Sequence, residues 1–353
     1  MTETKKSPKI FQNWITPLFL ILSSLIVVIG IKLYAPHNPY IERVIVVLGI
    51  NIILVVALNL SNGYTGVFSL GHVGFMAIGA YVSSILSLAI ETKATNLPDL
   101  PAWLAHVQLG FLPSLLIAGF LAALIAFLIG IPLMRLSGHY VSVATLGFLV
   151  IVHIVLINWT QFTRGARTFS GVIQYTNIWW VYVWIVLTIY LVWRIVHSPY
   201  GRALIAVRED SIAAQSMGIN ILRSRLLAFV ISAFLTAIGG GLMAHYLTSF
   251  SPATFYFTAT FNYIIMLVVG GLGSISGSIL GTTLVTFLSE ILRNAELGMQ
   301  IGSIKIPAVY GLSQIILSIS FVLIVILRRK GLMGDREIDF NWLKRVFPNS
   351  TQT

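Results

Sequence analysis

Ten long apolar runs, separated by mostly short polar connections, constrain this chain more than any other feature of its sequence. Each is close to the roughly 20 residues that a helix needs to cross the hydrocarbon core of a bilayer. We therefore expect membrane helices near residues 15–34, 41–60, 67–90, 112–134, 140–159, 177–196, 226–247, 258–273, 275–292 and 308–327.

The composition leads to the same class of protein. Hydrophobic residues make up 57% of the chain and charged residues only 9%, and the mean hydropathy is +0.91. A water-soluble domain of this composition would expose a large apolar surface. The predicted fold is thus an all-α polytopic membrane helix bundle, with a tail at 1–14, a transmembrane domain at 15–327 and a second tail at 328–353.

The basic residues indicate the orientation in the membrane. The net charge is +11, yet the lysines and arginines sit singly at the ends of apolar runs, which is typical of topology signals and not of a nucleic-acid-binding stripe. With the N-terminus in the cytoplasm, fifteen of the 22 basic residues fall on that side and seven on the other. This bias predicts an even number of crossings, two cytoplasmic termini and a cytoplasmic loop at 197–225.

Two apolar regions are interrupted by glycines, at Asn62–Gly74 and at Gly270–Gly277. The first predicts a broken or re-entrant segment, which needs protein or a wet cavity around its backbone. The second predicts a tight turn between two helices, followed by the four-residue spacing of Gly273, Gly277 and Gly281 that permits close helix packing. Packing is the commoner reason for such glycines, and a role in a transport pathway is the alternative.

The polar stretch at 197–225 contains the signals of a short helix. Asp210 or Ser211 can cap its N-terminus, Glu209 favours that end of the helix dipole, and Gly218 suits a left-handed end. Its apolar side chains are Ala213, Ala214 and Met217. They suit either a groove on a partner protein or the bilayer surface.

Several motifs in this order resemble one known family. They read GRALIAVREDSIAAQSMGI, followed by LLAFVISAFLTAIGGGLMAHYL, and before them LNLSNGYTGVFSLGHVGFMAIGAY and YVSVATLGFLVIVHIVLINWTQFTRG; VGGLGSISGSILG comes last. Together they resemble the permease subunits of branched-chain amino acid ABC importers, the LivM family, over most of residues 45–290. In that family the first motif is the coupling helix that docks on the ATPase. The matching positions here are Arg208, Glu209, Asp210, Ala213, Ala214 and Gly218.

The resemblance also implies the partners and the location. They are two ABC ATPase subunits, a paralogous permease, a periplasmic or extracellular substrate-binding protein and the lipid of a prokaryotic inner membrane, with no nucleic acid. The chain has no Gly-x-x-x-x-Gly-Lys-Ser/Thr phosphate loop, so ATP is expected on the partner subunits and no cofactor on this chain, which is then not an enzyme.

Polar side chains within the apolar runs and the glycine-interrupted segment around Gly66 are candidates for the translocation path, because polar side chains and unpaired backbone groups are costly in a membrane. The candidates are Gly66, Ser69, His72, Thr145, His153 and Asn262. A histidine in a helix bundle is more often a hydrogen-bonded packing residue than a ligand. No metal site is expected, and the absence of cysteine excludes thiolate ligands and disulfides.

Other functions remain open at this stage. Related permeases carry urea or short amides, and the motifs do not separate these substrates from leucine. A self-sufficient channel or secondary transporter is disfavoured because the eleven acidic residues fall in loops, tails or helix ends. An intramembrane enzyme ranks last, since the chain lacks a His-Glu-x-x-His motif, any thiol and a pair of membrane carboxylates.

Overall fold

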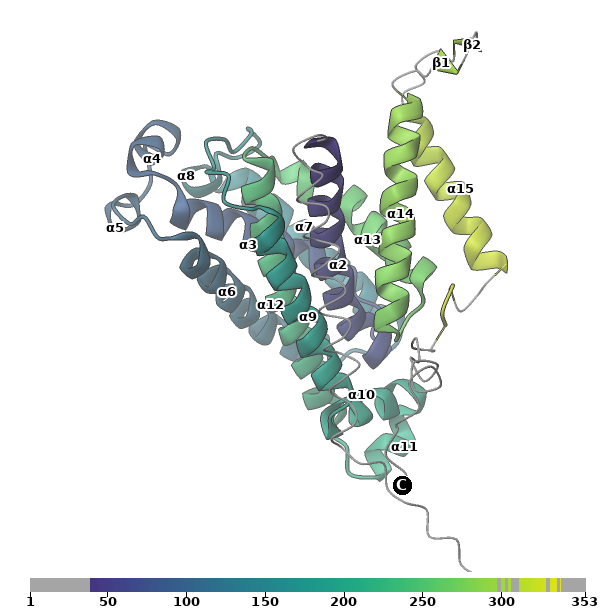
Figure 1. The fold of residues 1–353 in the computed structure, drawn as a ribbon. Coiled ribbons are helices and arrows are strands. Elements are labelled where there is room, and N and C mark those ends of the chain that lie inside the picture. Colours follow the sequence, from purple (N-terminus) through teal and green to yellow (C-terminus); the bar gives the residue numbers. More distant parts are fainter. Residues whose placement is uncertain are drawn as a thin grey trace, which may run out of the picture. The chain divides into compact units, whose positions relative to one another are not determined.

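The computed structural model describes residues 39–296, 300–301, 304–305, 311–327, 331–334 and 337. Nearly all of its regular structure is helical (Figure 1). The longer helices are α2 (Pro39–Thr65), α3 (His72–Ser87), α6 (Phe111–Leu133), α7 (His139–Asn158), α9 (Ile178–Val196), α10 (Pro199–Glu209), α12 (Ile221–Leu247), α13 (Phe257–Gly270), α14 (Ile275–Glu296) and α15 (Leu312–Leu327). The short elements are α4 (Ile90–Asn96), α5 (Ala102–Ala105), α8 (Thr160–Thr163), α11 (Ser211–Ser216), the 3-10 helix η3 (Pro252–Phe255) and the antiparallel strands β1 (Gln300–Ile301) and β2 (Ile304–Lys305).

The expected count of ten membrane helices is not confirmed. Among the described residues, seven helices are long and apolar enough to cross a membrane, or eight if α3 and α4, bent by 118° at their junction, form one span. The run at 15–34 lies outside the described residues, and the run at 308–327 becomes the 16-residue helix α15, which is short for a crossing. The run at 67–90 was predicted too long, because its helix starts only at His72 and ends at Ser87.

Residues 46–337 form one compact unit, and the packing described below belongs to it. The described residues outside it, 39–45, are the first turns of α2.

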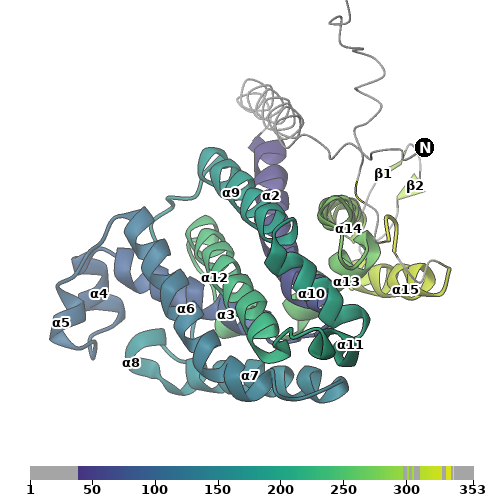
Figure 2. The same cartoon turned by 90° about the horizontal axis from the view of Figure 1, so that it is seen from below.

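The interior of this unit is built on α12, which packs against α3 and α6 (Figure 2). The approach of α3 and α12 requires glycine on both sides. A Cβ on Gly79 would overlap the carbonyl oxygen of Ala237, and one on Gly240 would overlap that of Met76. Small residues that allow backbones to touch are the usual means of helix packing where lipid gives no hydrophobic drive.

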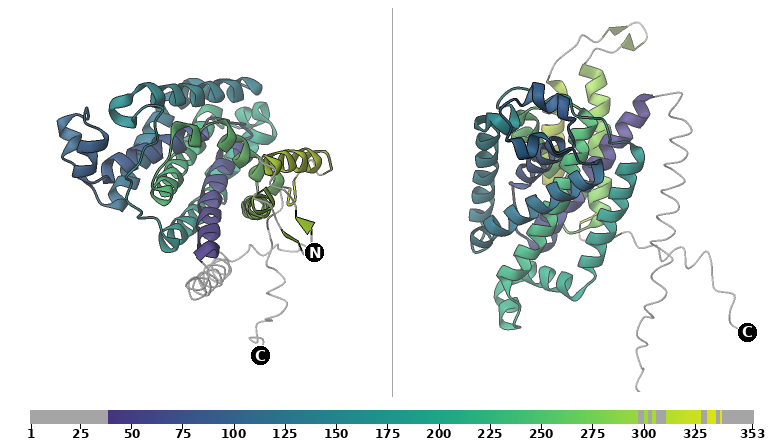
Figure 3. Two further views of the ribbon diagram at one scale, coloured as in Figure 1. Left: turned by 90° about the horizontal axis from the view of Figure 1, so that it is seen from above. Right: turned by 90° about the vertical axis from the view of Figure 1, so that its left-hand side faces the viewer.

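Helices α13, α14 and α15 pack on one another and form a second group (Figure 3). Here too the contact is between backbones, since a Cβ on Gly277 would lie 2.7 Å from the carbonyl oxygen of Gly270 and one on Gly281 would overlap that of Met266. Polar side chains join the group to α2, where Asn51 Nδ2 donates to Thr286 Oγ1 at 3.3 Å.

The two ends of the unit differ. One end carries α4, α5 and α8 (Figure 1). There the buried ammonium of Lys93 donates to the backbone carbonyls of Leu104 and Val107, and Trp103 is 71% exposed. The other end carries α10 and α11, which hold the segment predicted to couple to a partner.

Large apolar side chains cover the outer faces of α6 and α7. Phe120, Leu128, Val143 and Ile151 are all at least 60% exposed. An apolar surface of this extent is typical of contact with lipid or with another membrane subunit.

Candidate functional site

The segment between α9 and α12 folds as two helices joined at Asp210. Ser198 caps α10 by accepting from Gly201 N, and Pro199 occupies its first turn. Asp210 ends α10 and caps α11, its Oδ1 accepting from Ile212 N at 2.9 Å and Ala213 N at 3.0 Å. The predicted short helix is therefore confirmed. Helix α10 was not predicted, although Ser198 followed by Pro199 is a standard helix-start signal.

The exposed face of α11 differs from the predicted one. Ile212 is 78% and Met217 83% exposed, whereas Ala214 is only 4% exposed. Ala213 is exposed as well. Ala214 was predicted to face a partner, which is wrong, because α11 lies against the start of α12 and turns this side chain inward. Gly218 then reverses the chain with φ +83°, as predicted.

Arg208, the last basic residue of α10, reaches from this segment to both glycine-interrupted regions. Its Nη1 donates to Gly63 O at 3.0 Å, near the end of α2, and its Nε and Nη2 donate to Glu209. A Cβ on Gly66 would lie 2.8 Å from the Arg208 side chain, and a Cβ on Gly273 would overlap its guanidinium. Both glycines have positive φ, +70° and +84°. The backbone thus leaves a slot for this one side chain.

The second glycine region is the predicted tight turn, and Asn59 of α2 holds it. Asn59 is 1% exposed. Its Oδ1 accepts from Gly273 N at 2.9 Å, and its Nδ2 donates to Ser274 O at 2.9 Å and Ser278 Oγ at 2.8 Å. One buried side chain therefore pairs with two backbone groups of the turn, Gly273 N and Ser274 O, and with Ser278 of α14.

Glu337 completes this arrangement from the C-terminal part of the chain. Its Oε1 accepts from Ile275 N at 2.7 Å and Tyr64 OH at 3.3 Å, and its Oε2 accepts from Ser276 N at 3.0 Å. The carboxylate caps α14, where a negative charge is favourable. Just before it, Leu332 N and Met333 N donate to the last carbonyls of α13.

These contacts form one connected network, which we call the polar joint. It consists of Asn59, Tyr64, Arg208, the turn at 270–274 and Glu337. Neither Asn59 nor Glu337 was predicted to have a role. Asn59 could have been noticed as a lone amide in an apolar run, whereas nothing local marks Glu337.

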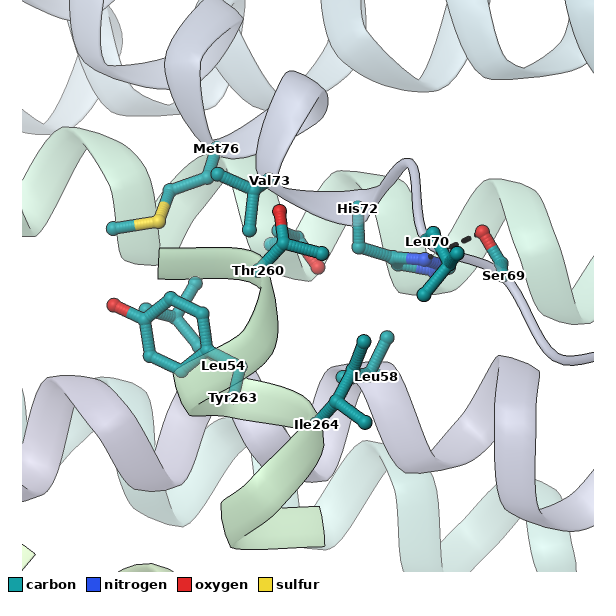
Figure 4. A pocket seen from close by; sticks show the side chains of 11 residues that line it. Leu54, Leu58, Ser69, Leu70, His72, Val73, Met76, Thr260, Tyr263 and Ile264 are labelled. Atoms are coloured by element: carbon teal, nitrogen blue, oxygen red, sulfur yellow. Dashed lines mark hydrogen bonds between the residues drawn. The ribbon is translucent and has the colours of Figure 1, made fainter. Parts of the chain in front are cut away.

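A small cavity lies where α2, α3, α12 and α13 meet, beside the loop at 66–71 (Figure 4). Its volume is about 10 Å³. Its walls are mainly apolar: Leu54, Leu58, Leu70, Val73, Met76 and Ile264. Among its polar lining residues, His72 Nε2 and Thr236 Oγ1 are buried and have no hydrogen-bond partner in the described part of the chain.

Only some of the other residues predicted to line the translocation path lie at this cavity. Ser69 Oγ lies 3.0 Å from His72 Nδ1, so these two share the cavity wall. Thr145 supports the same loop by accepting from Leu70 N at 3.0 Å. Gly66 faces Arg208 instead.

His153 and Asn262 do not line this cavity. The His153 ring stacks on Tyr256 with 3.8 Å between ring centroids, and Asn262 is half-buried on α13. Of the three glycines predicted to pack helices, Gly277 and Gly281 contact the backbone of α13, whereas Gly273 lies in the turn. In the described residues no group of three or more histidine, cysteine or acidic side chains could hold a metal ion.

Helices of this length and hydropathy, with apolar outer faces, define a multi-pass membrane protein. Residues 40–327 match the family model described as the branched-chain amino acid transport system permease component, and the chain belongs to this family. The expected resemblance is thereby confirmed.

Individual relatives agree with the family. The chain is 32% identical to the high-affinity branched-chain amino acid transport system permease protein LivM of Escherichia coli over 69% of its own length and 62% of that protein. It is 25% identical to the probable branched-chain amino acid transport permease protein LivM of Methanocaldococcus jannaschii, over 84% and 94% of the two chains. The E. coli permease protein LivH is 25% identical over 81% of this chain and 92% of its own. No solved structure matches the chain.

Proposed function

We propose that this chain is the permease subunit of an ATP-driven, binding-protein-dependent importer of branched-chain amino acids. The names of the relatives and of the family support the substrate class. On this proposal ATP binds to partner ATPases, a paralogous permease completes the pore, and a substrate-binding protein delivers the amino acid from outside.

The exposed face of α11 is the observation that carries the coupling role. Ile212 and Met217 project from a short cytoplasmic-side helix and are about four-fifths exposed. Two large apolar side chains on a helix that the fold leaves uncovered fit a groove on a partner protein. The ATPase docks on this face.

The polar joint carries the motion from α11 into the bundle. Arg208 ends the helix that precedes α11 and is hydrogen-bonded to the end of α2, so displacement of α11 pulls on the backbone at Gly63. Asn59 ties the same helix to the α13–α14 turn. Force on the docking face is thus transmitted to helices that line the cavity.

The translocation path runs through the cavity at His72. Aliphatic walls with a few hydrogen-bonding groups suit an apolar amino acid. Its volume of about 10 Å³ holds roughly one water molecule, so this conformation is closed at that point. Separation of α13 from α2 and α3 opens it.

The decisive experiment combines co-purification with transport. The tagged chain is expressed with its paralogous permease and ATPases, purified in mild detergent and reconstituted with the binding protein, and uptake of labelled leucine and urea is measured with ATP. We expect leucine uptake that requires ATP and the binding protein. Urea uptake in place of leucine would correct the substrate. Uptake by this chain alone without ATP would replace the proposal with a self-sufficient carrier.

Variants of α11 test the docking face. Ile212→Ser combined with Met217→Ser should release the ATPase during purification and abolish ATP-driven uptake. Tyr200→Ser is the matched control, because Tyr200 is 67% exposed on the neighbouring helix α10 but lies outside α11. A double variant that retains the ATPase as well as the control does would disprove docking at this face.

A further inference from the structure

A cleft with no part in the proposed transport cycle lies behind α11. It is bounded by the turn between α6 and α7, by α11 and by the first two turns of α12, and its volume is about 580 Å³. A cleft of this size accommodates a ligand headgroup and not merely a few waters.

The charge of the cleft is one-sided. Two guanidinium groups, of Arg135 and Arg225, line it, and no acidic residue does. Arg225 Nε is buried and has no hydrogen-bond partner among the described residues. The nearby carboxylate of Asp210 is engaged in capping α11 and does not line the cleft. Two arginines without an acidic partner are suited to a phosphate, whose oxygens match the guanidinium fork.

The cleft and the docking face use different residues of the α11 segment. Ser211 and Gln215 line the cleft, whereas Ile212 and Met217 do not. The apolar contact that Ile212 and Met217 offer to the ATPase is thus distinct from the arginine pair of the cleft.

The level of the cleft favours lipid. Arg225 lies in the second turn of α12, a helix long and apolar enough to span the membrane, so its head is at the depth of the phospholipid headgroups. Leu136, Ile221 and Leu222 add apolar wall beside the two arginines. Basic pockets between membrane helices on the cytoplasmic side commonly bind anionic lipid heads.

We propose that this cleft binds the phosphate of an anionic phospholipid headgroup through Arg135 and Arg225. Because Ser211 and Gln215 of α11 form part of the wall, the bound lipid steadies the coupling helix on which the ATPase docks. The inference concerns a ligand site and does not depend on which amino acid is transported.

The test measures lipid retention. The full complex is reconstituted in nanodiscs of equimolar phosphatidylcholine and phosphatidylglycerol, extracted in mild detergent, and the lipids that remain bound are quantified by mass spectrometry. We expect phosphatidylglycerol to be enriched in the wild type and the enrichment to fall about tenfold in Arg135→Gln combined with Arg225→Gln, as expected for loss of charge-assisted hydrogen bonds. Thermal unfolding of the complex checks that the variant remains folded.

Arg223→Gln is the matched control, since Arg223 is exposed two residues before Arg225 on α12 but does not line the cleft. It should retain the lipid. Equal enrichment in the double variant and the control would overturn the proposal. Two further results would also overturn it. If inorganic phosphate removes the lipid enrichment and binds in its place, the cleft is a site for free phosphate. If the enrichment is seen only without the ATPase, a carboxylate of the ATPase is the occupant.

Discussion

Replacement of Arg208 by methionine is the sharpest test of how force passes from α11 to the bundle. Methionine retains an unbranched apolar stem but donates no hydrogen bond. The change removes the contact with Gly63 O at 3.0 Å and the ion pair with Glu209 at 2.7 Å.

The two lost contacts differ in weight. Glu209 is 66% exposed, and a solvent-exposed ion pair contributes about 0–1 kcal/mol. Gly63 O belongs to the last turn of α2, whose carbonyls have no partner within the helix, and the Arg208 side chain is only 21% exposed. A hydrogen bond from a charged donor in such a place contributes about 1.5–3 kcal/mol. The link between α10 and α2 should therefore weaken by about 10- to 100-fold.

The assay is the ratio of leucine transported to ATP hydrolysed by the reconstituted complex. We expect Arg208→Met to hydrolyse ATP near the wild-type rate, because α11 still docks, while the transport ratio falls about tenfold or more. Arg202→Met, on the exposed side of the same helix, is the control. The reasoning is refuted if the transport ratio is unchanged, or if ATP hydrolysis and transport fall together with the yield of complex, since Arg208 would then act only in folding.

Three further changes probe packing and capping. Gly240→Ala should lower the melting temperature of the complex strongly, because its Cβ would overlap a carbonyl oxygen of α3. Gly147→Ala, whose Cβ would have nothing within 4 Å, should raise the free energy of unfolding by about 0.5–1 kcal/mol. Equal melting temperatures of the two variants would contradict the close crossing of α3 and α12. Asn59→Leu should reduce the folded fraction in fluorescence-detected gel filtration, because it removes three hydrogen bonds to the α13–α14 turn and to Ser278 and leaves Gly273 N without its side-chain partner, at about 1–3 kcal/mol; a wild-type elution profile would argue against that role. Glu337→Ala should speed amide hydrogen exchange in the first turn of α14, since a lost cap costs about 0.5–2 kcal/mol, and unchanged exchange would show that the cap is not formed in solution.

Local sequence signals predicted the elements better than their packing. The apolar runs matched α6, α7, α9 and α14 closely, and the start at Asp210 and the reversal at Gly218 were predicted from capping chemistry alone. These features depend on neighbours within one helical turn, which a single sequence contains.

Hydropathy could not separate helices in the protein interior from helices at its surface. The apolar window of α2 is 78% buried and that of α6 only 39%, although both have a mean hydropathy of 2.7. Lipid and protein interior are equally apolar, so composition carries no information on which helix lies inside. Ala214, predicted to face a partner, could not be recognised as buried because its contacts come from tertiary packing of α11 against α10 and α12.

The polar joint could not be predicted from the sequence for a different reason. Asn59 meets Gly273 across 214 residues of chain, and Glu337 meets Ile275 across 62. No helical period or spacing rule connects such positions, because only the tertiary fold brings them together.

The polar joint also determines where the chain can tolerate an inserted residue. Many of its contacts are to backbone atoms, at Gly63, Gly273, Ile275 and Ser276, so they depend on where the chain runs more than on which side chains it carries there. One residue inserted at 60–66 would displace Gly63 O from Arg208, and one inserted at 270–276 would displace the groups that bind Asn59 and Glu337. The connection at 97–110 lies at the other end of the unit and its backbone contacts stay there, with Lys93 and Leu86 among its partners. An epitope or fluorescent label inserted beside the exposed Trp103 would therefore leave the coupling end undisturbed.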